Sequence, residues 1–323
     1  MPFARLATAT TPTAHLGLGL AAVGRPGYIT LGREADLPPT RSVEALRDRT
    51  LELLDAAYAL GVRYIDAARS YGRSEEFLAE WLHARPDIRD VVVGSKWGYT
   101  YTAGWRTDAE AHEVKDHSVA AYDRQRAETA ALLGDRLDLY QIHSVTPESP
   151  ALTDKDLHAR LADLADEGVT VGLSVSGPEQ AAAIRAALDV TVNGERLFRT
   201  VQATYNALET SAGPALAEAH EAGLTVLVKE AMANGRLAGP QAPAAVREAA
   251  ESAGLGCDAV ALALVLRQPW AGVVLSGAAT SVQLVSNLHA TAVDLDAEHL
   301  DRLTGLAEEP TAYWSTRAAL PWH

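Results

Sequence analysis

The amino-acid sequence predicts an α/β protein, a (β/α)8 TIM barrel with long loops after its third strand and at its C-terminus. Eight short apolar runs of the strand type recur along the chain, and longer stretches with helical periodicity lie between them. Such alternation implies parallel strands joined by helical crossovers, and eight units fit a closed barrel better than an open sheet. The expected strands are residues 15–21, 62–66, 90–96, 137–143, 170–176, 199–204, 224–230 and 272–277.

The stretches between these strands often end at glycine, which is a common helix stop. No low-complexity linker or shift of composition divides the chain, so we expect one barrel domain over residues 1–323. Residues 97–118 and 308–323 are long excursions that carry tryptophans, and we expect them to form a loop and a tail over a substrate pocket. The expected helices include residues 44–61, 74–85, 158–168, 178–188, 214–223 and 259–268.

Charge and composition exclude several classes of partner. The net charge is −14 with a pI near 5.1, so a nucleic-acid backbone or an anionic membrane would be repelled on average. Cys257 is the only cysteine, which excludes an intramolecular disulfide and suits a reducing compartment. We see no signal peptide and no stretch of membrane-spanning length, and therefore expect a cytoplasmic protein. The periodicity does not decide between a monomer and a homo-oligomer.

Four titratable side chains follow three successive predicted strands. The second strand ends at Asp66 with Tyr71 just beyond it, the third ends at Lys96, and the fourth ends at His143. In a barrel of this type the chemistry sits where strands run into their following loops. Each residue alone has an ordinary structural interpretation. Asp66 could hold its own loop by hydrogen bonds, Tyr71 could be a half-buried ring, Lys96 a solvated strand end, and His143 a hydrogen-bonded core histidine. Together, however, these side chains would need ion-pair or hydrogen-bond partners if they are buried. Because their strands are adjacent, we expect them to be partners of one another.

Such a cluster can move a proton. A phenol is a poor acid at neutral pH, but a lysine ammonium within about 4 to 6 Å lowers its pKa by about 1 to 3 units. We therefore expect Tyr71 to act as a general acid, with Asp66 fixing Lys96 and His143 donating a hydrogen bond to the substrate oxygen.

The segments YIDAARSYGRSEEFLAEWL, VVVGSKWG and DLYQIHSV resemble the successive signatures of the aldo-keto reductases, and the resemblance extends from about residue 15 to 290. It implies a barrel enzyme that reduces an aldehyde or ketone, or oxidises the matching alcohol, with a nicotinamide cofactor. The family's catalytic tetrad then falls on Asp66, Tyr71, Lys96 and His143. A cofactor-binding regulatory subunit of the same fold with little turnover is the alternative.

The resemblance also implies a set of cofactor contacts. Ser174 and Gln202 would bind the nicotinamide amide, although both also suit ordinary polar strand ends. Lys229 stands where relatives commonly present a stacking aromatic residue, and its stem would pack on the ring. Arg236 would reach the pyrophosphate, or lie in solvent as an ordinary surface arginine.

The stretch LSGAATSVQLVSNL is a small-residue loop that opens a helix at about Thr280, an arrangement that suits phosphate. Basic residues that many relatives place there for the 2′-phosphate are replaced, so NADP(H) is expected ahead of NAD(H) by a reduced margin. Asn287 would bind the adenine. The cofactor contacts expected in this stretch are Gly277, Ala278, Gln283 and Asn287.

The pocket walls are expected to be aromatic with few charges, which would suit a sizeable, partly apolar carbonyl compound. The tryptophans expected to contact the substrate are Trp97, Trp105 and Trp314, each of which also suits a lid packed on the core. We expect no metal site, because His112 and His117 are five residues apart whereas two helical zinc ligands need a spacing of four.

Overall fold

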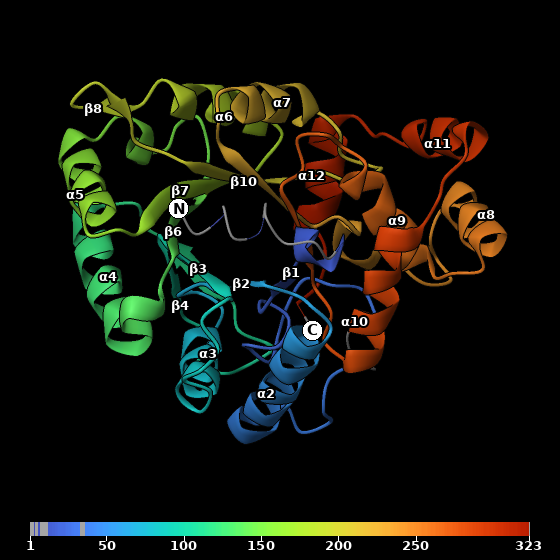
Figure 1. The fold of residues 1–323 in the computed structure, drawn as a ribbon, viewed down its shortest axis with the longest axis horizontal. Coiled ribbons are helices and arrows are strands. Elements are labelled where there is room, and N and C mark those ends of the chain that lie inside the picture. The colour runs from blue at the N-terminus through green and yellow to red at the C-terminus, as the bar shows by residue number, and fades with distance from the viewer. Residues whose placement is uncertain (1–2, 4–5, 7–11, 33–35, 323) are drawn as a thin grey trace.

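The computed structural model describes Phe3, Leu6 and residues 12–32 and 36–322, and a closed barrel of eight parallel strands lies at its centre (Figure 1). All eight strands overlap the predicted ranges, which confirms the (β/α)8 barrel. Around the barrel the strand order is β1-β12-β11-β10-β7-β6-β3-β2, and β1 also pairs with β2 to close the ring. The strands are β1 (Leu16–Gly19), β2 (Tyr64–Asp66), β3 (Val92–Trp97), β6 (Leu139–Val145), β7 (Thr170–Val175), β10 (Thr200–Thr204), β11 (Thr225–Lys229) and β12 (Val273–Ser276).

Helices between the strands cover the outside of the barrel (Figure 1). Several of them begin at a residue whose side chain accepts a hydrogen bond from the first turn, as Ser42, Ser118 and Asp154 do. The helices are α2 (Val43–Ala59), α3 (Ser74–His83), α4 (Val119–Leu133), α5 (Lys155–Asp166), α6 (Gln180–Leu188), α7 (Gly213–Glu221), α8 (Ala244–Ala253), α9 (Cys257–Leu266), α10 (Ser281–Leu288), α11 (Ala297–Thr304) and α12 (Pro310–Ala318).

Both long excursions contain regular structure that was not predicted. In the first, β4 (Tyr99–Tyr101) pairs antiparallel with β5 (Glu113–Lys115). In the second, α12 begins after Glu309, whose carboxylate accepts a hydrogen bond from the amide of Ala312 at 2.9 Å. The remaining short elements are the hairpin β8 (Thr191–Val192) and β9 (Glu195–Arg196) and the 3-10 turns η1 (Pro12–His15), η3 (Gly134–Arg136), η4 (Pro150–Leu152), η5 (Ala233–Gly235) and η6 (His289–Ala292).

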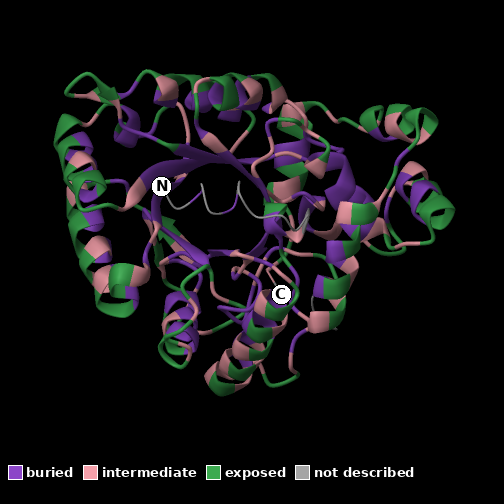
Figure 2. Cartoon of the chain, in the orientation of Figure 1, coloured by how far each residue is buried: buried purple, intermediate pink, exposed green. Residues whose placement is uncertain are grey.

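Burial differs between the strands and the helices. The strands are almost wholly buried, whereas the surrounding helices are buried on one face and exposed on the other (Figure 2). Inside the barrel, Tyr64 fills space that two glycines on neighbouring strands leave open. A β-carbon at Gly17 would lie 2.7 Å from the Tyr64 ring, and one at Gly94 would lie 2.4 Å from its hydroxyl oxygen. These glycines therefore make room for one large ring directly below the strand ends.

Within the described residues, no single helix is long and apolar enough to span a membrane. The pair α8 and α9 reaches that length and hydropathy only when joined, and a bend of 94° separates the two helices.

Candidate active site

The four residues predicted from the strand ends lie together at one mouth of the barrel. Asp66 ends β2, Tyr71 follows it in the loop, Lys96 lies near the end of β3, and His143 lies on β6. Because β2, β3 and β6 are neighbours in the barrel, these side chains converge. All four are buried, with 0% to 8% of their surface exposed.

Lys96 lies at the centre of the cluster. Its ammonium forms an ion pair with Asp66, donates to the carbonyl oxygen of Ala67 at 3.0 Å and lies 3.4 Å from the hydroxyl oxygen of Tyr71. That hydroxyl oxygen in turn lies 3.5 Å from Nε2 of His143. The phenol thus has a cation on one side and an imidazole on the other.

Asp66 is held by three donors, which fixes the orientation of its carboxylate. Besides Lys96, the hydroxyl of Tyr64 donates to its Oδ1 at 3.0 Å, and so does the side-chain amide of Gln202 at 3.0 Å. The contribution of Tyr64 was not predicted, although it lies two residues before Asp66 and so points to the same side of the strand.

Tyr71 is held by a close approach of two glycine-containing loops. Gly72 has a φ of +59°, and a β-carbon there would lie 2.4 Å from the carbonyl oxygen of Gly24. The amide of Arg73 donates to that same carbonyl at 2.8 Å. The guanidinium of Arg25 lies 5.2 Å from the centre of the Tyr71 ring, so the loop after β1 supports the phenol from the side.

The expected lowering of the Tyr71 pKa is wrong for this structure. Burial raises the pKa of the Tyr71 phenol well above its ordinary value, and the charge of Asp66 raises it further. Lys96 cannot offset this, because its ion pair with Asp66 leaves little net positive charge beside the phenol. Tyr71 is therefore fully protonated at neutral pH.

His143 is neutral. Burial lowers its pKa well below the ordinary value, and the charges of Lys96, Lys229 and Arg25 lower it further. Its Nδ1 lies 3.5 Å from the hydroxyl of Ser70, and its ring meets that of Tyr99 edge-on with centroids 5.1 Å apart. A neutral imidazole can donate one hydrogen bond from Nε2 when its tautomer places the proton there.

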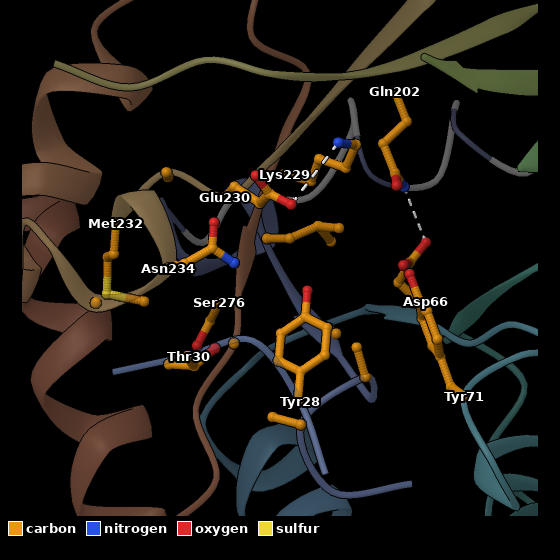
Figure 3. Close-up of a pocket in the computed structure, with 17 residues that line it drawn as sticks. Tyr28, Thr30, Asp66, Tyr71, Gln202, Lys229, Glu230, Met232, Asn234 and Ser276 are labelled. Carbon is orange, nitrogen blue, oxygen red and sulfur yellow. Dashed lines mark hydrogen bonds and ion pairs between the residues drawn. The ribbon is translucent and has the colours of Figure 1, made fainter. Parts of the chain in front are cut away.

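A cavity of about 110 Å³ begins at this cluster and runs towards β12 (Figure 3). Of the predicted cofactor contacts, Gln202, Lys229 and Gly277 line it. Gly277 has no atom within 4 Å of where a β-carbon would stand, which leaves open space beside the backbone. A glycine-lined cavity that leads to a helix N-terminus fits the phosphate-bearing part of a dinucleotide.

The other residues predicted around that helix contact the protein itself. Asn287 is 2% exposed, and its side-chain amide lies 2.7 Å from the hydroxyl of Ser276. Gln283 accepts a hydrogen bond from the amide of Ala279 at 2.9 Å, and Thr280 caps α10 as predicted. Ala278 is buried. These four residues shape the loop in this structure.

Two predicted contacts lie away from the cavity. Ser174 has no exposed surface, and its hydroxyl accepts a hydrogen bond from the amide of Ser144 at 2.8 Å. Arg236 forms an ion pair with Glu308 and lies 5.6 Å from the ring centre of Tyr313. The guanidinium thus binds the C-terminal tail in this structure, and its contact with a pyrophosphate stays a prediction.

The predicted substrate tryptophans line neither this cavity nor its neighbour. Trp97 is fully buried and packs on Tyr122 of α4, because it follows Lys96 directly and points to the opposite side of β3. Trp105 packs edge-on against Phe77, and its indole nitrogen donates to a backbone carbonyl in the loop before α2. Trp314 is buried beneath Lys229, with the ammonium 5.7 Å from its ring centre.

A second cavity, of about 160 Å³, is lined by Tyr71 and His143 and shares Tyr71 and Lys229 with the first. Its walls are charged, contrary to the expected aromatic walls with few charges. One aromatic wall is Trp322, which stacks on His112 with centroids 4.1 Å apart. The wall residues that were not predicted include Arg25, Tyr28, Glu113, Glu230 and Arg317.

Within the described ranges, no group of three or more histidine, cysteine or carboxylate side chains is placed to hold a metal ion. The ring of His117 lies between the hydroxyl of Ser149, 2.6 Å from Nδ1, and the carbonyl oxygen of His143, 2.8 Å from Nε2.

The sequence profile of the Aldo/keto reductase family matches residues 27–308. Among curated proteins, the chain is 31% identical over 168 residues to aldo-keto reductase str7 of Strobilurus tenacellus, a match that covers 51% of this chain and 45% of that protein. It is 28% identical over 106 residues to the aryl-alcohol dehydrogenase [NADP(+)] of Phanerodontia chrysosporium, covering 30% and 26%. The matches therefore span about half or less of the length of these two relatives.

Solved structures share the fold. An aldo-keto reductase from Klebsiella pneumoniae in complex with NADPH superposes with a TM-score of 0.66 at 22% identity, over 92% of this chain and 93% of that one. The profile match over residues 27–308 shows that the chain belongs to the aldo/keto reductase family, and the solved structure has the same barrel fold.

Proposed function

We propose that this protein is an NAD(P)H-dependent reductase that converts an aldehyde or ketone to the alcohol, with Tyr71 as the general acid. The observation that carries the proposal is the position of the Tyr71 hydroxyl, 3.4 Å from the Lys96 ammonium and 3.5 Å from His143 Nε2. Tyr71 also lines both cavities, so a cofactor in one and a substrate in the other would meet at the phenol.

In this mechanism a bound nicotinamide supplies a hydride to the carbonyl carbon. His143, as a neutral donor, holds the carbonyl oxygen beside the phenol, and Tyr71 transfers its proton to that oxygen as negative charge develops there. The product is the alcohol, and the resulting phenolate is stabilised by the Lys96 ammonium until solvent returns the proton. Asp66 keeps Lys96 in place, and Tyr64 and Gln202 keep Asp66 in place.

The cofactor residues that we propose are those of the first cavity and its loop. Gln202 and Gly277 would contact the cofactor directly, and the stem of Lys229 would pack on its nicotinamide ring. Ala278, Gln283 and Asn287 would shape the loop around its phosphate and adenine. NADP(H) is the proposed cofactor, because the names of the Phanerodontia and Klebsiella proteins specify NADP(+) and NADPH. NAD(H) remains the alternative, since Gly277, Ala279 and Gln283 replace the basic residues of many relatives.

Turnover tests the proposal. Oxidation of NADPH and NADH is followed with a panel of aldehydes and ketones, and binding of each cofactor is measured by tryptophan fluorescence. Cofactor-dependent reduction of a carbonyl compound by the wild type would support the proposal that the protein is a reductase. Tight cofactor binding without turnover of any carbonyl compound would instead favour a cofactor-binding regulatory subunit of the same fold.

A further inference from the structure

The charges that line the second cavity are nearly all paired. Arg25 donates to the carboxylate of Glu113 at 2.8 Å. Arg317 binds the carboxylate of Glu230 with two nitrogens, at 2.8 Å and 2.5 Å. Each of these pairs is neutral as a whole, and neither leaves a charge for a ligand to balance.

Lys229 is different, although it lines both cavities. Its ammonium donates to the hydroxyl of Thr204 at 2.7 Å, which is a neutral acceptor. A carboxylate oxygen of Glu230 lies 4.0 Å away (Figure 3). The same oxygen accepts a hydrogen bond from Arg317 at 2.5 Å. The described wall of the second cavity therefore carries one positive charge more than its carboxylates balance.

An ammonium in this position is costly without a counter-ion. The Lys229 side chain is 14% exposed. Removal from water penalises the charged form, and together with the charges of Arg317 and Lys96 it outweighs the opposite effect of Glu230 and Asp66, so that the pKa of Lys229 is lowered to about 8. Asp66 gives little relief, because its carboxylate is already paired with Lys96. An anionic group on a ligand would supply the missing charge.

We propose that the substrate is a small carbonyl compound that carries a carboxylate, and that the Lys229 ammonium binds this carboxylate. The inference rests on the proposed function, since it names the substrate class of that same site. A monoanion matches the single surplus charge, whereas a phosphate dianion would exceed it next to Glu113 and Glu230. A small compound of this kind suits a cavity of about 160 Å³.

Matched acids and esters test this. The ratio of kcat/KM is measured at pH 7 for succinic semialdehyde against its methyl ester, and for 4-carboxybenzaldehyde against its methyl ester. We expect the wild type to favour at least one acid by tenfold or more, and Lys229→Met to lose that preference through a higher KM. Lys229→Arg should retain part of it. Lys115→Met is the matched control, because Lys115 is exposed on β5 and lines neither cavity.

Two results would overturn the inference. One is turnover of the esters as readily as the acids by the wild type. The other is an unchanged acid preference in Lys229→Met. If that variant also lost tenfold in NADPH affinity, the lysine would be assigned to the cofactor pyrophosphate. A binding readout separates this from the proposed function: succinate or benzoate should quench tryptophan fluorescence in the presence of NADP+, and Lys229→Met should abolish that quenching. Failure to reduce any aldehyde would instead contradict the proposed function.

Discussion

The ammonium of Lys96 lies 3.4 Å from the hydroxyl oxygen of Tyr71, and the same ammonium is ion-paired with Asp66. The phenol therefore stands beside a neutral pair rather than a free cation, which keeps it protonated. This favours reduction, because a proton donor must carry its proton before the hydride arrives. The cation matters after transfer, when the phenolate has formed.

The two reaction directions should respond differently to pH. Since the pKa of Tyr71 is raised well above its ordinary value, reduction of an uncharged aldehyde should have a kcat that is flat from about pH 6 to pH 9. Oxidation of the matching alcohol needs the phenolate and should rise about tenfold per pH unit over that range. Steady-state rates in both directions check this, and a reduction rate that falls as pH rises past neutrality would contradict it.

The preference for a carboxylated substrate should depend on pH in the opposite sense to alcohol oxidation. Lys229 is charged below its pKa of about 8 and neutral above it, so the ratio of kcat/KM for acid and ester should be highest below pH 7 and decline through pH 8. The ratio cancels any titration of Tyr71, because both compounds use the same acid. A ratio that stays constant from pH 6 to pH 9 would show that another group binds the carboxylate.

Packing around Tyr64 should be sensitive to added volume. Gly94→Ala places a β-carbon 2.4 Å from the Tyr64 hydroxyl oxygen, so we expect the free energy of unfolding to fall by about 1–3 kcal/mol. Adding Tyr64→Phe should recover part of that loss. Gly277→Ala is the control, since its β-carbon would meet no atom within 4 Å. Denaturant unfolding measures all three, and equal effects at Gly94 and Gly277 would refute the packing argument.

Acid should destabilise the fold through His117. Burial lowers the pKa of His117 to about 4 from an ordinary value of 6.5, so the unfolded chain binds more protons between these values and stability falls as pH decreases. For this residue alone the loss between pH 7 and pH 5 is about 2 kcal/mol. His117→Gln should unfold more easily at pH 7 but lose less stability between pH 7 and pH 5. An unchanged slope would show that other groups dominate.

The proximity of Asp66, Tyr71, Lys96 and His143 could be predicted because strand ends in a parallel barrel meet at one face. Asp66, Lys96 and His143 each follow an apolar run directly, so their positions depend only on the number and order of the strands. The pairing of Asp66 with Lys96 was also predicted, but its effect on Tyr71 was not. Burial and the charge of Asp66 raise the pKa of the phenol instead of lowering it, and the extent of burial has no direct signal in the sequence.

The pocket walls were predicted less well, for two physical reasons. Trp97 was assigned to the pocket by its residue type, although alternation along β3 turns it away from the side that Lys96 occupies. Arg25, Glu113 and Arg317 come from three loops or tails whose mutual placement has no periodic signal in the sequence. The ion pair of Arg236 with Glu308 has no periodic signal either, because Glu308 lies 72 residues further along the chain.

The central claim is that Tyr71 donates the proton, and Tyr71→Phe tests it most directly. The substitution should lower kcat by about 10²–10⁴-fold with an uncharged aldehyde while the Kd for NADPH stays within about twofold, because only the acid is removed. Tyr58→Phe, on the surface of α2 with its hydroxyl bound to Asp90, should retain full activity. Wild-type kcat in Tyr71→Phe would contradict the account.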